Sequence, residues 1–225
     1  MKAKVAIVRA KNYELAELRW ALEKAFSSLG GLEESVPRGA QVFVKVNLLP
    51  PPSPPERGII THPVFTEAVL SLLKEITPHI VVGDDVHEAK SFEVGGYRQM
   101  CQRLGVELLN LRERGFAEVS LDGGLLKRVY IAQAVREADV VVNLPKLKTH
   151  ALTTFTGAIK NVYGVIPTGL RTALHGEHPH PAEFAQVLVD IFSLVRPRLT
   201  VMDGIVAMEG AGPANGTPRP LGLIL

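Results

Sequence analysis

The chain has 225 residues, of which 46% are hydrophobic and 21% are charged, and its formal net charge is +2. This length allows one large domain or two small lobes, and the composition is that of a folded globular protein rather than a disordered chain. The small net charge, the dispersed basic residues and the 6% aromatic content argue against a nucleic-acid-binding protein.

The apolar runs are short, and the N-terminus lacks the apolar core of a signal peptide. Runs such as Ile80–Val82 fall far below the about 20 residues that a membrane-spanning helix needs. Cys101 is the single cysteine, so an internal disulfide, a zinc ribbon and an all-cysteine iron–sulfur site are excluded, and we expect this thiol in a buried helix. We therefore expect a cytoplasmic protein without a membrane partner.

Short runs rich in β-branched residues alternate with amphipathic stretches, which is typical of a mostly parallel sheet. Six strands are predicted, at Lys4–Val8, Val42–Asn47, His79–Gly83, Val106–Leu111, Asp139–Asn143 and Leu199–Asp203. Apolar residues at helical spacing predict helices at Tyr13–Leu29, Pro63–Ile76, Phe92–Leu104 and Pro181–Val195. The segment Glu118–Ile131, with Asp122-Gly123-Gly124 at its middle, predicts an inserted β-hairpin.

We therefore expect a single α/β domain over residues 1–225, with a mostly parallel twisted sheet, flanking helices and the inserted β-hairpin. The apolar end Leu221–Leu225 predicts a further strand rather than a polar tail. For this reason we expect a chain truncated at its C-terminus.

Polar residues follow four of the predicted strands. They are Asn47, which leads on to Thr61-His62, then Asp84, then Asn143, and finally Asp203. Ligands of open α/β sheets bind beyond the carboxyl ends of the strands. A single polar residue after a strand is explained by a helix cap or a turn, but polar residues after four strands at the same edge of the sheet predict a ligand-binding site.

The segment Lys146-Leu-Lys-Thr-His150 directly follows a buried strand. Two ammonium groups and an imidazole in this loop produce a positive field that suits a phosphate or a carboxylate. The alternative is a solvated basic turn. We predict that Lys146, Lys148 and Thr149 bind an anionic substrate and that His150 exchanges a proton with it.

The following segment, Thr156–Gly164, places a glycine before a short predicted helix. It is not a Walker loop, because the second glycine and the lysine–hydroxyl pair are missing. Lys160 is either an ordinary surface lysine or an active-site lysine that acts as a charge clamp or nucleophile. We take Lys160 as a catalytic candidate and Asn161 as a binding residue.

Histidines and an aspartate complete the candidate set. His175-Gly-Glu-His178-Pro-His180 has the composition of a metal-binding tract, although its glycine and proline predict a loop without a fixed ligand face. His62 precedes a helix-opening proline and is either a cap or an acid–base group. Asp203 opens a glycine-rich segment and is a candidate for orienting a catalytic side chain or binding a metal.

These motifs resemble the family catalogued as domain of unknown function three-six-two, some of whose members carry a ferredoxin-type module. The resemblance covers nearly the whole chain. It rests on Lys45–Asn47, Thr61–Pro63, Gly83–Asp84, Leu144–His150, Thr156–Asn161, Val201–Gly204 and Met208–Pro213. Such a module would imply electron transfer, with an iron–sulfur cluster held by residues absent from this chain.

The order and spacing of His150, Lys160 and His175 are similar to a segment of nickel-pincer lactate racemases. This similarity implies that His150 is the acid–base group, that Lys160 anchors a nickel-containing nucleotide cofactor, and that His175 is a metal ligand. We add Asp84 as a second candidate metal ligand. Asn47 and a proline-rich stretch stand where that family has an Asp-His-Thr-Arg motif.

The leading expectation is an enzyme that acts on a small carboxylate or phosphate by acid–base or metal-assisted chemistry, with a racemase-like reaction as one form of it. The alternative is an iron–sulfur-associated electron-transfer or anion-binding protein without catalysis of its own. An oligomer is compatible with both. The catalytic candidates are His150, Lys160 and Asp203, and the binding candidates are Lys45, Asn47, His62, Lys146, Lys148, Thr149 and Asn161.

Overall fold

A five-stranded parallel sheet forms the centre of the computed structural model, which describes residues 4–225; residues 1–3 of the expected domain lie outside the described residues. The strand order is β10-β7-β2-β3-β4, and all four neighbouring pairs are parallel. The strands are β2 (Val42–Lys45), β3 (Ile80–Asp84), β4 (Glu107–Asn110), β7 (Val140–Asn143) and β10 (Leu199–Thr200). The predicted α/β fold and five of the six predicted strands are thus confirmed.

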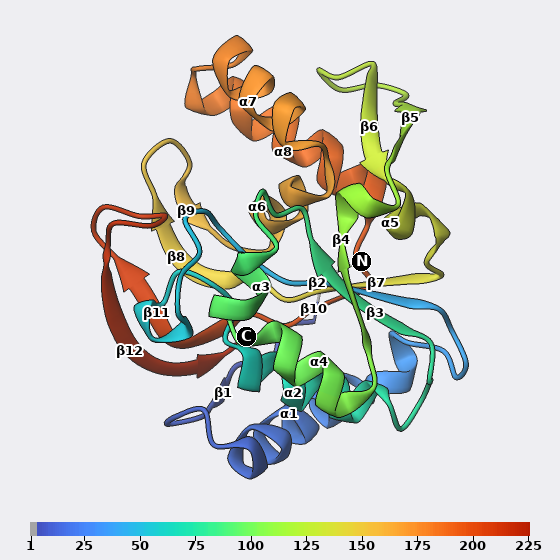
Figure 1. Ribbon diagram of the computed structural model, residues 1–225, viewed down its shortest axis with the longest axis vertical. Helices are drawn as coiled ribbons and strands as arrows, with labels where there is room; N and C mark the ends of the chain where they lie inside the picture. The colour runs from blue at the N-terminus through green and yellow to red at the C-terminus, as the bar shows by residue number, and fades with distance from the viewer. Residues whose placement is uncertain (1–3) are drawn as a thin grey trace.

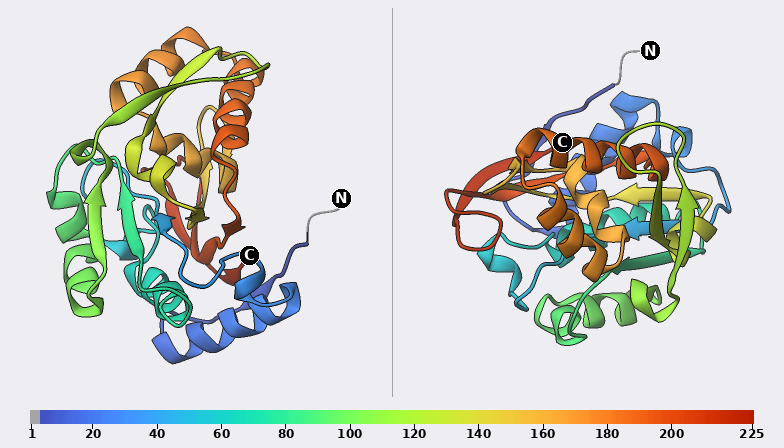
Figure 2. Two further views of the ribbon diagram at one scale, coloured as in Figure 1. Left: turned by 90° about the vertical axis from the view of Figure 1, so that its right-hand side faces the viewer. Right: turned by 90° about the horizontal axis from the view of Figure 1, so that it is seen from above.

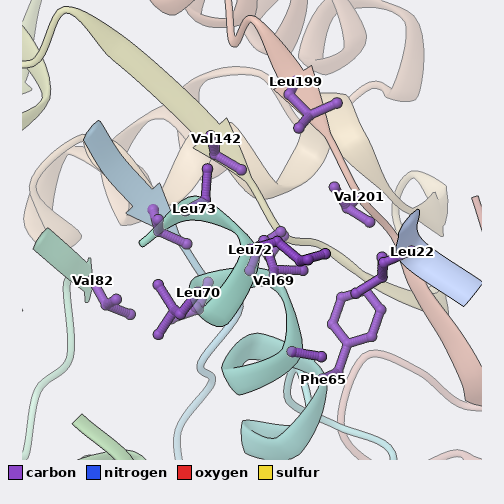
Figure 3. Close-up of a cluster of buried hydrophobic side chains, with 14 of the residues drawn as sticks. Leu22, Phe65, Val69, Leu70, Leu72, Leu73, Val82, Val142, Leu199 and Val201 are labelled. Atoms are coloured by element: carbon purple, nitrogen blue, oxygen red, sulfur yellow. The ribbon is translucent and has the colours of Figure 1, made fainter. Parts of the chain in front are cut away.

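Helices cover both faces of this sheet (Figure 1). On one side lie α1 (Leu15–Leu29), α2 (Pro63–Leu73) and α4 (Tyr97–Leu104), and on the other lie α6 (Ala158–Val162), α7 (Thr168–Glu177) and α8 (Pro181–Val195), as Figure 2 also shows. Successive residues of a strand point to opposite faces of the sheet. Val42 and Val44 therefore pack in the hydrophobic core on the side of α1 and α2, and Phe43 packs in the core on the side of α8. Figure 3 shows apolar side chains of α2 packed against those of the sheet.

The helix limits follow local backbone chemistry. The helix predicted over Phe92–Leu104 is two helices, α3 (Lys90–Val94) and α4, because Gly96 adopts a left-handed conformation with φ 78° between them. The predicted hairpin is confirmed as β5 (Phe116–Ser120) paired antiparallel with β6 (Arg128–Ala132), and it leads into α5 (Gln133–Glu137). Four 3-10 helices complete the helical elements, at Leu32–Glu34, Pro55–Arg57, Leu111–Glu113 and Tyr163–Val165. Within residues 4–225, no helix is long and apolar enough to cross a membrane.

A second, mixed sheet was not predicted. It has the order β1-β12-β11-β8-β9 and comprises β1 (Val8–Arg9), β8 (Lys146–His150), β9 (Thr154–Thr156), β11 (Asp203–Glu209) and β12 (Thr217–Ile224). The prediction of a first parallel strand at Lys4–Val8 is wrong, because only β1 forms there and it pairs antiparallel with β12. The strand predicted at the C-terminal end is confirmed within β12.

The lysine-rich segment is a strand of this second sheet and not the loop that we expected. Strand β8 pairs parallel with β11 and antiparallel with β9. Along β8, Lys146 and Lys148 are buried while Leu147 is partly exposed, so the usual alternation of apolar and polar residues is inverted. A hydrophobic pattern therefore could not reveal this strand.

A buried ion pair joins the elements of the second sheet to the helices. Lys146 Nζ lies 2.8 Å from Asp203 Oδ2, and both side chains are fully buried. The Tyr13 hydroxyl accepts from Lys146 at 2.9 Å and donates to Asp203 Oδ1 at 2.9 Å. The backbone N–H of His62 donates to Asp203 Oδ2 at 3.0 Å, and the His62 ring stacks on Tyr13. The pair thus links β8 and β11 to the segment before α1 and to the start of α2.

Asp203→Asn should lower the free energy of unfolding by about 3–5 kcal/mol, because it leaves the Lys146 ammonium buried without its carboxylate. Urea unfolding followed by circular dichroism measures this loss. The matched double variant Lys146→Met/Asp203→Leu removes both charges and should lose less. A loss below about 1 kcal/mol for Asp203→Asn would show that the pair is not the connection inferred here.

Candidate functional site

A small polar cavity lies at the carboxyl ends of β2 and β3, where the sheet meets α6 and α7. Its volume is about 70 Å³. The lining residues come from the two strand ends, the proline-rich segment, the second sheet and the helices: Lys45, Asn47, Leu48, Leu49, Asp84, His150, Thr156, Lys160, Asn161, Tyr163, Gly164 and Arg171. We call it the polar cavity. Its place agrees with the rule that open α/β sheets bind ligands beyond the strand ends.

Three asparagines fix one wall of the polar cavity. Asn47 donates from Nδ2 to Asn161 Oδ1 at 3.0 Å, and Asn161 donates from Nδ2 to Asn143 Oδ1 at 2.8 Å. Asn143 in turn donates to the backbone oxygen of Ala158 at 3.0 Å. This chain of hydrogen bonds ties α6 to the ends of β2 and β7.

Lys45 and Asp84 form a buried ion pair at the next wall. Lys45 Nζ lies 2.8 Å from Asp84 Oδ1, and the other carboxylate oxygen of Asp84 accepts the N–H of Leu48 at 2.8 Å. Burial lowers the pKa of Lys45, and the charge of Asp84 opposes that effect. A Cβ atom on Gly164 would lie 2.8 Å from Lys45 Nζ, so a glycine is needed where the backbone passes this pair.

A second carboxylate, Asp85, holds Arg171 in place. Arg171 Nη2 donates to Asp85 Oδ2 at 2.7 Å, and Arg112 donates to Oδ1. Burial alone would raise the pKa of Asp85, but the Thr168 hydrogen bond and the two guanidinium groups lower it, so this carboxylate stays ionised. Arg171 is thereby held in a fixed position through its Nη2 atom.

Three buried side-chain atoms among residues 4–225 lack hydrogen-bond partners, and all three belong to residues that line the polar cavity. They are Asn47 Oδ1, Thr156 Oγ1 and Arg171 Nε. A buried polar atom without a partner costs about 1–3 kcal/mol, so native proteins leave few of them. The residues that carry these atoms all line one cavity, which makes this cavity the candidate site for a polar ligand.

Lys160 offers the cavity an amine that is not neutralised by a carboxylate. Its Nζ lies over two ring faces, 4.7 Å from the centre of Tyr163 and 5.2 Å from the centre of Phe184. Burial, with a smaller contribution from the charge of Arg171, lowers the pKa of Lys160 to about 8. A substantial fraction of this amine is therefore neutral just above neutral pH.

His150 is a neutral imidazole at the same cavity. Burial, together with the charge of Lys160, lowers its pKa to about 4. Its Nδ1 accepts the N–H groups of Leu152 at 3.2 Å and Thr153 at 3.3 Å. In the neutral ring the proton then resides on Nε2, so His150 offers a hydrogen-bond donor.

His175 lies beside this group on α7. Its ring is nearly parallel to that of His150, with 6.4 Å between the ring centres, and it stacks on Phe184 at 4.1 Å. Burial lowers its pKa to about 4. The prediction of a loop at His175 is wrong, because α7 extends through Gly176 to Glu177, so His175 has a fixed orientation on a helix.

The structure brings together six of the predicted site residues at the polar cavity: Lys45, Asn47, Asp84, His150, Lys160 and Asn161. It places Lys146, Asp203 and His62 in the separate buried ion-pair cluster, where the His62 Nδ1 caps α2 by accepting the Val64 N–H.

The other two predicted anion-binding residues of β8 bond to backbone oxygens. Lys148 donates to the backbone oxygen of Ile59, and Thr149 donates to that of Gly210. Burial and the charge of Lys146 lower the pKa of Lys148 to about 7.

Sequence reasoning missed Thr156, Tyr163, Gly164 and Arg171 as lining residues. A signal for Arg171 existed, since Thr168 and Arg171 lie three residues apart, on one face of a helix. Nothing in the sequence showed that both would bind Asp85, which is 83 residues away from Thr168.

The residues present fit a metal only in a limited way. Within residues 4–225, no group of three or more His, Cys, Asp or Glu side chains could hold a metal ion. Asp84 is paired with Lys45, whereas His150 and His175 are two neutral imidazoles close together. A metal at the two histidines would therefore need further ligands from outside these side chains.

The family model described as "Domain of unknown function (DUF362)" matches residues 42–225. The chain belongs to this family. A curated relative, thylakoid-associated protein sll1697 of Synechocystis sp., is 33% identical over 228 residues, which cover 100% of this DUF362 chain and 70% of that protein.

Two solved structures share the fold of this DUF362 chain. The lactate racemase apoprotein from Thermoanaerobacterium thermosaccharolyticum aligns with a TM-score of 0.55 and 12% identity, over 96% of this chain and 54% of the racemase. A protein from Thermotoga maritima aligns with a TM-score of 0.51 and 14% identity, over 96% and 56% of the two chains. The chain thus spans about half the length of these structures, and the likeness concerns the fold.

Sulfate affinity should fall by about tenfold as the pH rises from 7 to 9, because the folded-state pKa of Lys160, about 8, is crossed and its charge is lost. Sulfate keeps its charge over this range, and His150 and His175 are already neutral. Isothermal titration calorimetry measures the affinity. Lys160→Met should bind sulfate more weakly and with less pH dependence, whereas Lys127→Met, an exposed lysine of the hairpin, should behave as the unaltered protein. A pH-independent affinity in the unaltered protein would contradict this assignment.

Proposed function

We propose that this DUF362 protein is an enzyme that binds the head group of an organic anion in the polar cavity and moves a proton beside it. The observation that carries the proposal is that the three residues with an unpartnered buried side-chain atom, Asn47, Thr156 and Arg171, all line one cavity. A ligand that accepts from Arg171 Nε and Thr156 would satisfy both atoms.

The charges of the cavity favour an anion. Its lining holds three cationic side chains, Lys45, Lys160 and Arg171, against the single carboxylate of Asp84. Asp85 lies behind Arg171 and fixes the guanidinium without filling the cavity. A carboxylate or phosphate head group therefore meets a positive field in a site that is largely removed from water.

The neutral form of the Lys160 amine suits it to act as a base. It would accept a proton from the carbon beside the bound carboxylate, and the electron pair left behind would move onto the carboxylate oxygens. The Nε2–H of His150 and the Nε–H of Arg171 would donate to those oxygens, and the Lys160 ammonium would return the proton. In this proposal His150 donates a hydrogen bond, whereas the sequence suggested that it exchanges the proton.

Return of the proton by Lys160 to the same face would give hydrogen exchange alone, and its return to the opposite face, after the planar intermediate has turned over in the cavity, would give racemisation or epimerisation. The fold shared with the lactate racemase apoprotein is compatible with this reaction class. A nickel-containing nucleotide, if bound, would supply hydride chemistry at the same carbon. In that case Lys160 would hold the organic part and His175 would supply a nitrogen ligand, because both imidazoles are neutral.

Proton abstraction can be tested by incubating the protein with a panel of 2-hydroxy and 2-amino carboxylates in D2O. Proton nuclear magnetic resonance should show loss of the signal of the hydrogen beside the carboxylate for at least one compound. The exchange rate should rise with pH through about 8, the folded-state pKa of Lys160, because the neutral amine is the base.

Lys160→Met should lower this exchange rate by at least about 100-fold, the usual contribution of a positioned base. Lys127→Met, on the exposed hairpin, is the matched control and should exchange at the unaltered rate. Exchange that survives Lys160→Met would remove this residue from the chemistry. Sulfate binding without exchange of any compound would favour a non-catalytic anion-binding protein.

A further inference from the structure

A larger, apolar groove adjoins the polar cavity. Its volume is about 440 Å³, within the range of roughly 300–1,000 Å³ that is usual for sites of organic ligands. It lies between the β8–β9 turn, α6 and the outer side of α8, and its lining residues are mostly apolar: Leu152, Thr153, Thr154, Phe155, Gly157, Ala158, Ile159, Lys160, Pro181, Ala185, Leu188, Val189 and Met202. We call it the apolar groove.

Three large apolar side chains of this groove are exposed to solvent. Phe155 is 48% exposed, Ile159 is 44% exposed and Val189 is 43% exposed. They come from three elements, β9, α6 and α8, and the groove brings them together. A cluster of exposed apolar side chains in a concave surface indicates a binding site rather than ordinary surface.

The groove and the polar cavity share a wall. Lys160 lines both, and the consecutive residues Thr156 and Gly157 line the polar cavity and the groove respectively. The segment from Thr156 to Lys160 therefore borders both spaces, and they meet at the Lys160 side chain.

The two volumes differ in what they can hold. The polar cavity, at about 70 Å³, has room for about two water molecules at roughly 30 Å³ each, which is the size of a carboxylate or phosphate head group. The body of any larger organic anion must lie outside it. The apolar groove is the adjoining space, and it is apolar where the cavity is charged.

We propose that the ligand of this protein is an amphipathic organic anion whose head group lies in the polar cavity and whose apolar body lies in the groove formed by Phe155, Ile159 and Val189. This inference rests on the proposed anion site and names the class of its ligand. Lys160, at the shared wall, would then contact the atoms between the head group and the apolar body.

The test is a series of straight-chain carboxylates, acetate, butanoate, hexanoate and octanoate, titrated calorimetrically into the protein. Each methylene that enters the groove should raise the affinity by about fourfold. Sulfate, which has no apolar body, reports on the polar cavity alone. Octan-1-ol, which has no charge, reports on the groove alone and should bind more weakly than octanoate.

Two variants alter the groove at exposed positions of α8. Val189→Asn makes its wall polar, and Ala185→Phe fills it; both should abolish the dependence on chain length while leaving sulfate affinity within about twofold. Leu125→Asn, a 42% exposed leucine of the hairpin, is the matched control and should keep the chain-length dependence.

Three other results of these titrations would each contradict a different part of the proposal. Equal affinity for acetate and octanoate, with sulfate still bound, would overturn the groove assignment and leave the anion site standing. Failure to bind either sulfate or acetate would overturn the anion site itself. Octan-1-ol bound as tightly as octanoate would show that the groove binds its ligand independently of the polar cavity. A change of oligomeric state in Val189→Asn, seen by analytical ultracentrifugation, would show that the groove is an interface between copies of the chain.

Discussion

Lysine amines that lie inside the protein each require an acceptor, and this requirement organises the region where the two sheets meet. Lys45 is paired with Asp84, Lys146 with Asp203, and Lys148 donates to a backbone oxygen. Each amine so satisfied joins elements that are distant in sequence. Within residues 4–225, no carboxylate pairs with Lys160, whose amine lies over aromatic faces. The structure thus separates lysines that hold the fold from one that is available to a ligand.

The polar cavity depends on this arrangement. Asp84 and Asp85 are consecutive residues that pair with different cations. Asp84 forms an ion pair with Lys45, and Asp85 forms one with Arg171. The asparagine chain from Asn47 to Asn143 holds α6 against the strand ends. Because these contacts use most of the polar atoms, the few that remain without partners define a small and directed surface for a ligand.

The apolar groove lies next to this polar surface and is lined mostly by apolar residues. Small residues at the start of α6, its N-cap Gly157 and Ala158, and the exposed face of α8 leave room beside Lys160. In the proposed site, the small charged cavity takes the head group of the ligand and the apolar groove, which shares Lys160 with it, takes the apolar body. The hydrophobic effect would supply affinity in the groove, while hydrogen bonds and charge would orient the head group.

The sequence by itself determined the central parallel sheet, most of its helices and the hairpin, because apolar periodicity and turn residues are local signals. It also indicated six residues of the polar cavity: Asn47 and Asp84 because residues that follow parallel strands converge, and Lys45, His150, Lys160 and Asn161 from their sequence motifs. Only the tertiary structure decided which lysines have a carboxylate partner. Lys146 and Lys160 are alike in sequence terms, but Asp203, 57 residues away from Lys146, neutralises one of them, and such long-range pairing has no local signature. The second sheet was hidden for the same reason, because burial of lysines on β8 requires partners that folding alone brings near.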